Sequence, residues 1–307
     1  MNETAVLQLR NVTKKIGRRT IVDHLSFDVP RGEVFGFLGP NGAGKTTTIR
    51  MIVGLIGMSD GEVYVQGIPV KKEFENAMRH VGAIVENPEM YKFLTGYQNL
   101  VHYARMHSGV TKQRIQEVVE LVGLKNRIHE KVKKYSLGMR QRLGVAQAIL
   151  HKPSVLILDE PTNGLDPAGI RELRDYLRRL AREEGIAIVV SSHLLSEMEL
   201  MCDRVAIIQN GKLIDVQSLH DAKTVEQRRV TIETDDPLRA KETLESVLSV
   251  TDVAVREGEI ELLADREQIA VITEMLVHAG SKIYGIRSAS KSLEDQFLEM
   301  TGSEQIV

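Results

Sequence analysis

"GPNGAGKT", residues 39–46, decides the fold, because it satisfies the pattern G-x-x-x-x-G-K-[ST] at every fixed position. The apolar run "VFGFL" precedes it and "KTTTIRMIVGL" continues from it, which predicts a strand, a loop and a helix in that order. In such a loop the glycines turn backbone N–H groups toward a phosphate, Lys45 reaches the β- and γ-phosphates, and the Thr46 hydroxyl can ligate Mg²⁺. The sequence therefore predicts a phosphate-binding loop with a metal beside it.

"SVLILDE", residues 154–160, predicts a second part of this site at the end of a buried strand. Because neighbouring strand residues face opposite sides, Asp159 can face the metal while Glu160 is aimed at a water that attacks the γ-phosphate. "IAIVVSSH", residues 186–193, predicts another buried strand, so His193 would lie at the same carboxyl edge, within reach of the γ-phosphate. The alternative is a polar strand end and a histidine with a structural role only.

"YSLGMRQRLGVAQAIL", residues 135–150, predicts a helix with a second anion site at its start. Ser136 can accept a backbone N–H as the N-cap, and Gly138 allows a ligand to approach the main chain closely. The free amides and the positive dipole end of such a helix favour an anion. The residues alone leave open whether Ser136 binds a ligand, caps its own helix, or does both.

Strands alternate with helices over the first 220 residues, which favours a parallel sheet covered on both faces. Buried strands are expected at 33–39, 154–160 and 186–193, and an antiparallel pair at 5–10 and 21–29. Helices are expected near 45–55, 72–79, 95–107, 112–122, 138–150 and 168–185. The predicted fold class is α/β with a parallel core sheet and an antiparallel β edge.

The composition changes after about residue 220. The pattern there predicts the order βαββαβ of a ferredoxin-like unit, closed by a last helix in "SLEDQFLEMTG". The expected strands are 228–234, 251–256, 258–264 and 282–287, and the expected helices are 236–248 and 266–279. No residues in this region mark a pocket, so support of a dimer is a simpler role for it than the sensing of a small effector.

The totals describe an ordinary globular chain of 307 residues, with 42% hydrophobic and 27% charged residues. One cysteine excludes an internal disulfide, and neither a signal peptide nor an apolar run long enough for a membrane helix is visible, so a cytosolic location is expected. Residues 221–307 carry 18 acidic and 10 basic residues, an excess that would repel nucleic acid. No nucleic-acid partner is expected.

Five motifs in order, "GPNGAGKTT", "YSLGM", "VLILDEP", "NGLD" and "SSH", resemble the nucleotide-binding subunit of the ATP-binding cassette (ABC) family. The resemblance implies a P-loop NTPase cassette over residues 4–219, with a helical insert at about 87–150, and a small α+β ferredoxin-like accessory domain over 220–307. It implies ATP and Mg²⁺ as cofactors and ATP hydrolysis as the activity. The residues implied to contact ATP are Gly39, Pro40, Asn41, Gly42, Ala43, Gly44, Lys45, Thr46, Thr47 and Ile16.

The resemblance also assigns roles to residues outside the loop. Catalysis is implied for Glu160 and His193, and metal binding for Thr46, Glu86 and Asp159. In this family two subunits form a head-to-tail homodimer, so Ser136 and Gly138 would clamp the ATP of a partner copy, and Asp166 would lie in the loop that connects the two sites.

The sequence departs from the family pattern at three places. Leu137 and Met139 replace a glycine and a glutamine of the signature, which removes a side-chain hydrogen bond but leaves Ser136 and Gly138. Glu86 stands where the family has a glutamine, so it adds a negative charge near ATP. Ile16 stands near the position where an aromatic usually stacks on adenine.

The combination of Glu86, "YSLGM" and "SLEDQFLEMTG" resembles the branch that exports peptide antibiotics, other drugs or lipid-like molecules, including the bacitracin- and lantibiotic-export type linked to antibiotic resistance. It implies integral membrane permease subunits as partners and a location at the inner face of the cell membrane. We expect the permease to dock on the helical insert, at the aromatic residues Tyr91, Phe93, Tyr97 and Tyr103. The alternative is a soluble cassette ATPase that acts in repair, translation or assembly.

Overall fold

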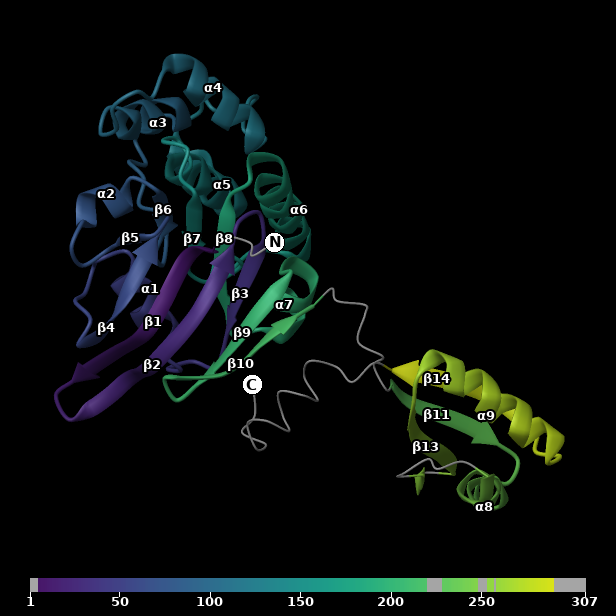
Figure 1. Cartoon of the computed structure of the whole chain (residues 1–307). Coiled ribbons are helices and arrows are strands. Elements are labelled where there is room, and N and C mark those ends of the chain that lie inside the picture. Colours follow the sequence, from purple (N-terminus) through teal and green to yellow (C-terminus); the bar gives the residue numbers. More distant parts are fainter. Residues whose placement is uncertain (1–4, 220–227, 248–252, 257, 290–307) are drawn as a thin grey trace. The chain divides into compact units, whose positions relative to one another are not determined.

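The computed structural model describes residues 5–219, 228–247, 253–256 and 258–289. The chain divides into two compact units on either side of residue 220, which we call the first and second units (Figure 1). Within the described ranges, no helix is both long enough and apolar enough to cross a membrane.

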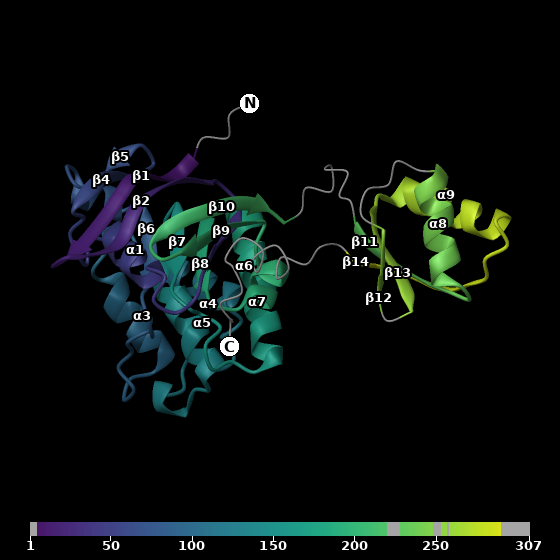
Figure 2. The ribbon, with the colours of Figure 1, turned by 90° about the horizontal axis from the view of Figure 1, so that it is seen from below.

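A mostly parallel sheet forms the centre of the first unit (Figures 1 and 2). Its middle strands are buried along their whole length and are apolar except for the two serines that end β8, as expected for a sheet covered on both sides. Only β10 runs antiparallel to its neighbour. In sheet order the strands are β10 (Lys212–Ser218), β9 (Arg204–Gln209), β3 (Val34–Leu38), β8 (Ala187–Ser192), β7 (Val155–Leu158) and β6 (Val81–Ile84).

A second, antiparallel sheet packs on this core through one hydrophobic cluster. The Phe27 ring of β2 stacks on Phe35 of β3 with ring centroids 5.3 Å apart, which joins the two sheets. Strands β1 and β2 pair antiparallel, which confirms the antiparallel pair predicted at 5–10 and 21–29, although both strands are longer than expected. In sheet order the strands are β2 (Arg19–Pro30), β1 (Ala5–Ile16), β4 (Asp60–Val65) and β5 (Ile68–Pro69).

Helices follow the core strands and hold the loops of the site in place. Those outside the insert are α1 (Lys45–Ile52), α2 (Phe74–Met78), α6 (Pro167–Glu184) and α7 (Leu195–Met201). The insert contains α3 (Gly96–Ala104), α4 (Lys112–Leu121), the 3₁₀ turn η1 (Val132–Lys134) and α5 (Leu137–Ala148), with α3 and α4 at one end of the unit (Figure 1).

Arg114 connects two helices of the insert. It is buried on α4, and its guanidinium donates to the carbonyl oxygens of Ile149 at 3.0 Å and Leu150 at 3.4 Å, just past the last residue of α5. Carbonyls at a helix C-terminus lack partners within the helix, and a cation there is favourable. The side chain therefore caps α5 from its neighbour.

The second unit has the predicted order βαββαβ. Its four antiparallel strands lie in the order β12-β13-β11-β14, which is the ferredoxin-like arrangement, and the apolar residues of its core include Val230, Ile232, Ile260 and Leu276. The helix predicted in "SLEDQFLEMTG" lies outside the described residues. The elements are β11 (Arg228–Thr234), α8 (Pro237–Val247), β12 (Ala254–Arg256), β13 (Glu259–Ala264), α9 (Arg266–His278) and β14 (Ile283–Ala289).

Candidate active site

The loop predicted to bind phosphate connects β3 to α1, so the predicted order of strand, loop and helix is confirmed. Gly42 and Gly44 have φ angles of 82° and 103°, in the left-handed region that favours glycine. A Cβ on Gly39 would lie 2.3 Å from the carbonyl oxygen of Ile208, so a larger residue does not fit there. No side chain caps the start of α1, which leaves its first amides free for an anion. The backbone therefore forms a cradle that suits a phosphate.

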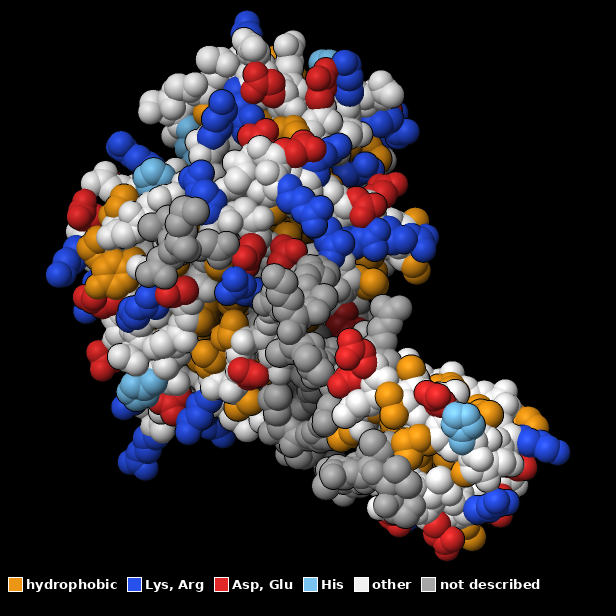
Figure 3. Space-filling model, turned by 45° about the vertical axis from the view of Figure 1, so that its right-hand side comes forward, with side chains coloured by type: hydrophobic (Ala, Val, Ile, Leu, Met, Phe, Trp, Pro, Cys, Tyr) orange, Lys and Arg blue, Asp and Glu red, His pale blue; other side chains and the backbone are white. Residues whose placement is uncertain are grey.

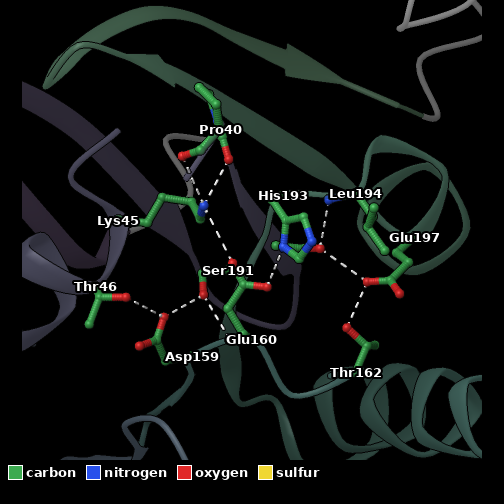
Figure 4. Close-up of polar contacts among 12 residues, drawn as sticks. Pro40, Lys45, Thr46, Asp159, Glu160, Thr162, Ser191, His193, Leu194 and Glu197 are labelled. Carbon is green, nitrogen blue, oxygen red and sulfur yellow. Dashed lines mark hydrogen bonds and ion pairs between the residues drawn. The ribbon is translucent and has the colours of Figure 1, made fainter. Parts of the chain in front are cut away.

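Lys45 folds back into this loop. Its side chain is 5% exposed, and Nζ donates to the carbonyl oxygens of Gly39 at 2.7 Å and Pro40 at 3.3 Å (Figure 4). Nζ also lies 3.4 Å from the Glu160 carboxylate. The ammonium group is thus held beside the cradle by oxygen atoms, for which a bound phosphate can substitute.

The predicted metal ligands Thr46 and Asp159 lie together (Figure 4). The Thr46 hydroxyl donates to Asp159 Oδ1 at 3.3 Å, and Asp159 is buried. One hydroxyl and one carboxylate beside a phosphate site fit Mg²⁺, which binds few protein ligands and keeps water and phosphate oxygens around it. In the described ranges, no group of three or more His, Cys, Asp and Glu side chains could hold a metal ion. A metal at Thr46 and Asp159 would therefore also need water or phosphate oxygens.

Ser191 of β8 connects the two acidic residues. Its hydroxyl donates to Asp159 Oδ1 at 2.7 Å and accepts from the backbone N–H of Glu160 at 2.9 Å. Glu160 needs this support because its φ angle is +47°, a conformation that costs about 1–3 kcal/mol in a non-glycine residue. In the "SSH" motif only the histidine was predicted to act in the site, and no pattern in the sequence indicates that this serine orients both acids.

Glu160 and His193 lie at the same edge of the sheet, and they contact each other, which was not predicted from the sequence. Glu160 Oε2 lies 2.8 Å from His193 Nδ1, while Oε1 faces Lys45, so the carboxylate lies between the lysine and the histidine (Figure 4). Asp159 contacts Thr46 instead, in agreement with the predicted alternation of the two acids along the chain. The arrangement can hold a carboxylate beside a γ-phosphate, where it could orient or deprotonate a water.

Ser136 and Asp166 both cap helices of their own chain. The Ser136 hydroxyl accepts from Met139 N at 3.2 Å, and Asp166 Oδ1 accepts from Gly169 N at 2.8 Å. A Cβ on Gly138 would meet Leu165 Cδ2 at 3.7 Å, an ordinary contact, so the two segments lie side by side. Among the described residues, no hydrogen bond joins Ser136 or Gly138 to residues 39–46. The site therefore lacks a contribution from its own signature segment.

Two predicted site residues lie apart from the others. The Glu86 carboxylate forms an ion pair with Arg50 of α1, its side chain is 62% exposed, and its φ angle is +66°. No hydrogen bond among the described residues links it to Thr46 or Asp159. Ile16 is exposed at the end of β1. Arg50 as the partner of Glu86 was not predicted from the sequence.

Known proteins resemble this chain over most of its length. The family model described as ABC transporter matches residues 22–163. The chain is 59% identical over 297 residues to an uncharacterized ABC transporter ATP-binding protein, YhcH of Bacillus subtilis (strain 168), covering 97% of this chain and 96% of the relative. It is 39% identical to the bacitracin transport ATP-binding protein BcrA of Bacillus licheniformis, with 99% of each chain covered. It is 38% identical to the lantibiotic transport ATP-binding protein SrtF of Streptococcus pyogenes, over 72% of this chain and 95% of the relative.

Solved structures agree with the fold of the first unit. An ATP-binding subunit of an ABC transporter superimposes with a TM-score of 0.63 at 29% identity, covering 70% of this chain and 91% of that chain. A dimeric ATP-binding cassette in a post-hydrolysis state with ADP and Pi gives a TM-score of 0.62 at 23% identity, over 70% of this chain and 99% of that one. The predicted α/β cassette is thus confirmed, and the chain belongs to the ABC transporter family as an ATP-binding subunit that hydrolyses ATP.

Proposed function

We propose that this ATPase powers the export of a peptide antibiotic, a drug or a lipid-like molecule through a separate membrane permease. The observation that carries the proposal is the similarity to BcrA, a bacitracin transport protein, over 99% of both chains, which includes the second unit as well as the cassette. A repair, translation or assembly factor is not favoured, because the relatives named here are ABC transporter proteins.

The residues of the candidate site have distinct roles in hydrolysis. Backbone amides of the loop and of the start of α1, within residues 41–47, and the Lys45 ammonium bind the phosphates of ATP, with Gly39 and Pro40 beside them. Thr46 and Asp159 hold Mg²⁺, which supplies charge neutralisation at the phosphates when bound. Glu160 orients the attacking water, and His193 keeps Glu160 in place and reaches the γ-phosphate. Ile16 would contact the adenine from the end of β1, and Glu86 would be available as a further metal ligand only without its ion pair to Arg50.

A second copy of the chain completes the site. Gly138 has room for a methyl group in its own chain, so a close approach by a ligand explains the glycine better than internal packing does. We assign that ligand as the ATP held by the partner copy, with Ser136 and Gly138 at its γ-phosphate. Asp166 lies next to this segment and connects the two sites of the homodimer.

The permease docks on the aromatic part of the helical insert, at the inner face of the membrane. Phe93 is 68% exposed and Tyr91 is 44% exposed, and their rings are in edge contact at 5.8 Å. Exposed aromatic clusters are typical of interface cores. Tyr97 and Tyr103 are half-buried, and the Tyr103 hydroxyl donates to the Glu89 carbonyl oxygen at 2.7 Å. On the face drawn in Figure 3, acidic and basic side chains are interspersed over the first unit. We propose no nucleic-acid partner.

Glu160→Gln tests the hydrolytic part of the proposal. The variant should bind ATP, form a trapped dimer and hydrolyse ATP poorly, because the amide cannot accept a proton from water. Steady-state phosphate release and size-exclusion chromatography with ATP measure these properties. Turnover at the unmodified rate would contradict the role of Glu160.

Co-purification tests the transport part. A tagged chain expressed with its genomic neighbours should retain a multi-span membrane protein, and Phe93→Ser should reduce the retained amount while ATP binding stays unchanged. Lys72→Ser, an exposed residue of the cassette, is the control. Equal retention by the chain and by Phe93→Ser would place the docking surface elsewhere.

A further inference from the structure

Glu197 of α7 is a buried carboxylate that contacts two loops of the site. Its Oε2 atom accepts hydrogen bonds from the Thr162 hydroxyl at 2.6 Å and from the Ser192 hydroxyl at 3.0 Å (Figure 4). Thr162 is 3% exposed, Ser192 1% and Glu197 9%. One oxygen atom therefore joins segments that are 35 and 5 residues away from it along the chain.

Each of these segments carries a residue of the site. Thr162 follows Glu160 by two positions and precedes Asp166 by four. Ser192 directly precedes His193, and its hydroxyl also accepts the backbone N–H of Leu194 at 3.0 Å, which fixes the turn around the histidine. The Glu197 carboxylate thus fixes the position of the loop from Glu160 to Asp166 relative to the turn that carries His193.

Burial makes these bonds necessary. A carboxylate away from water is costly unless hydrogen bonds compensate it, and a buried hydroxyl without a partner is costly as well. Removal of the Glu197 carboxylate would leave the hydroxyls of Thr162 and Ser192 without this acceptor, so both loops would gain freedom to move. The contact between Glu160 and His193 at 2.8 Å depends on the relative position of these loops.

We propose that Glu197 is a positioning residue for ATP hydrolysis, acting through Thr162 on the loop of Glu160 and Asp166 and through Ser192 on His193. The proposal rests on the proposed roles of Glu160 and His193. Two measurements distinguish this role from a purely structural one. A positioning residue affects kcat, whereas a structural residue affects the melting temperature and the amount of folded protein.

The experiment uses Glu197→Leu, which removes the acceptor, and Glu197→Gln, which can keep an oxygen at the same place. Glu197→Leu should lower kcat by about tenfold or more, since a displacement of about 1 Å can cost two orders of magnitude, while KM for ATP stays within about twofold. Glu197→Gln should recover most of the lost kcat. Glu199→Leu, an exposed carboxylate on the same helix, is the control and should leave kcat unchanged.

Two further variants decide the matter if Glu197→Leu does not fold. Thr162→Val removes one hydroxyl without a change of shape, and Ser192→Ala removes the other. Each should lower kcat at constant KM, because each removes one of the two hydrogen bonds that Glu197 accepts.

The inference is overturned if Thr162→Val and Ser192→Ala both keep the kcat of the unmodified chain, or if every loss of activity follows the loss of folded protein. This failure differs from failure of the proposed function. If Glu160→Gln is inactive while these variants are fully active, the hydrolytic site is right and only the role of Glu197 is wrong. If Glu160→Gln stays active, the site assignment itself fails.

Discussion

Gly138→Ala tests whether the start of α5 only packs within its own chain or also approaches the ATP of a partner copy. In its own chain, the new methyl group would meet only Leu165 Cδ2, at 3.7 Å, so the folded subunit can accept it. In a dimer that clamps ATP, the same methyl group would stand where the γ-phosphate of the partner approaches the backbone. The melting temperature should therefore rise while kcat falls.

The expected magnitudes follow from the position of the residue. Alanine is favoured over glycine by about 0.8–1 kcal/mol inside a helix, and Gly138 is the second residue of α5, so we take about half of that gain. For a unit of this size, a gain of about 0.5 kcal/mol raises the melting temperature by roughly 1–2 °C. A methyl group that shifts the phosphate by about 1 Å lowers kcat by about 10- to 100-fold.

The assays are thermal unfolding, ATP titration at low protein concentration, and steady-state ATPase activity as a function of protein concentration. Gly144→Ala is the matched control on the same helix. Its Cβ would lie 2.6 Å from Pro88 Cβ, so overpacking of about 1–3 kcal/mol should lower the melting temperature. A more stable Gly138→Ala variant with undiminished turnover would refute the clamp, and a less stable one would refute the packing argument.

Three other perturbations test the site and its surroundings. Lys45→Ala should weaken ATP binding at least about tenfold, because charged hydrogen bonds contribute about 1.5–3 kcal/mol, and an unchanged dissociation constant in an ATP titration would count against the cradle. Glu86→Gln should raise the Mg²⁺ concentration needed for half-maximal ATPase activity, whereas identical curves would exclude Glu86 as a ligand. Burial lowers the pKa of His151 to about 4, so only the unfolded chain takes up this proton as the pH falls from about 6.5 to about 4, and stability decreases over that range. In His151→Phe, which can keep the ring stack on His107, the melting temperature should fall less between pH 7.5 and pH 5 than in the unmodified chain; an equal fall would mean that His151 does not contribute.

The sequence predicted the parts of the site that lie within short motifs. The loop at 39–46, the acidic pair after β7 and His193 after β8 are each local patterns, and parallel strands bring them to one edge of the sheet. The fold class follows from the same alternation of strands and helices. The order of the second unit was also predicted, since its strands and helices are short and well separated.

The contacts that orient the site could not be predicted from the sequence. Ser191 acts on residues 31 and 32 positions away, and Arg50 pairs with a residue 36 positions away, so only the folded chain brings them together. Strand β4 and helix α7 were not predicted from the sequence. Strand β10 was not predicted either: its exposed and half-buried residues alternate, but the apolar Ile214 and Val216 lie on the exposed face, so the hydrophobic pattern of the sequence does not show which face is buried.

The cap that Arg114 provides has a mechanical consequence for α5. The helix is anchored at its far end by a neighbouring side chain and begins at Ser136, and its 12 residues span about 18 Å. A stiff rod fixed in this way transmits displacement along its length instead of absorbing it. A push delivered to α4 therefore arrives at the other end of α5 as a shift of the serine and glycine, without any need for the helix to unwind.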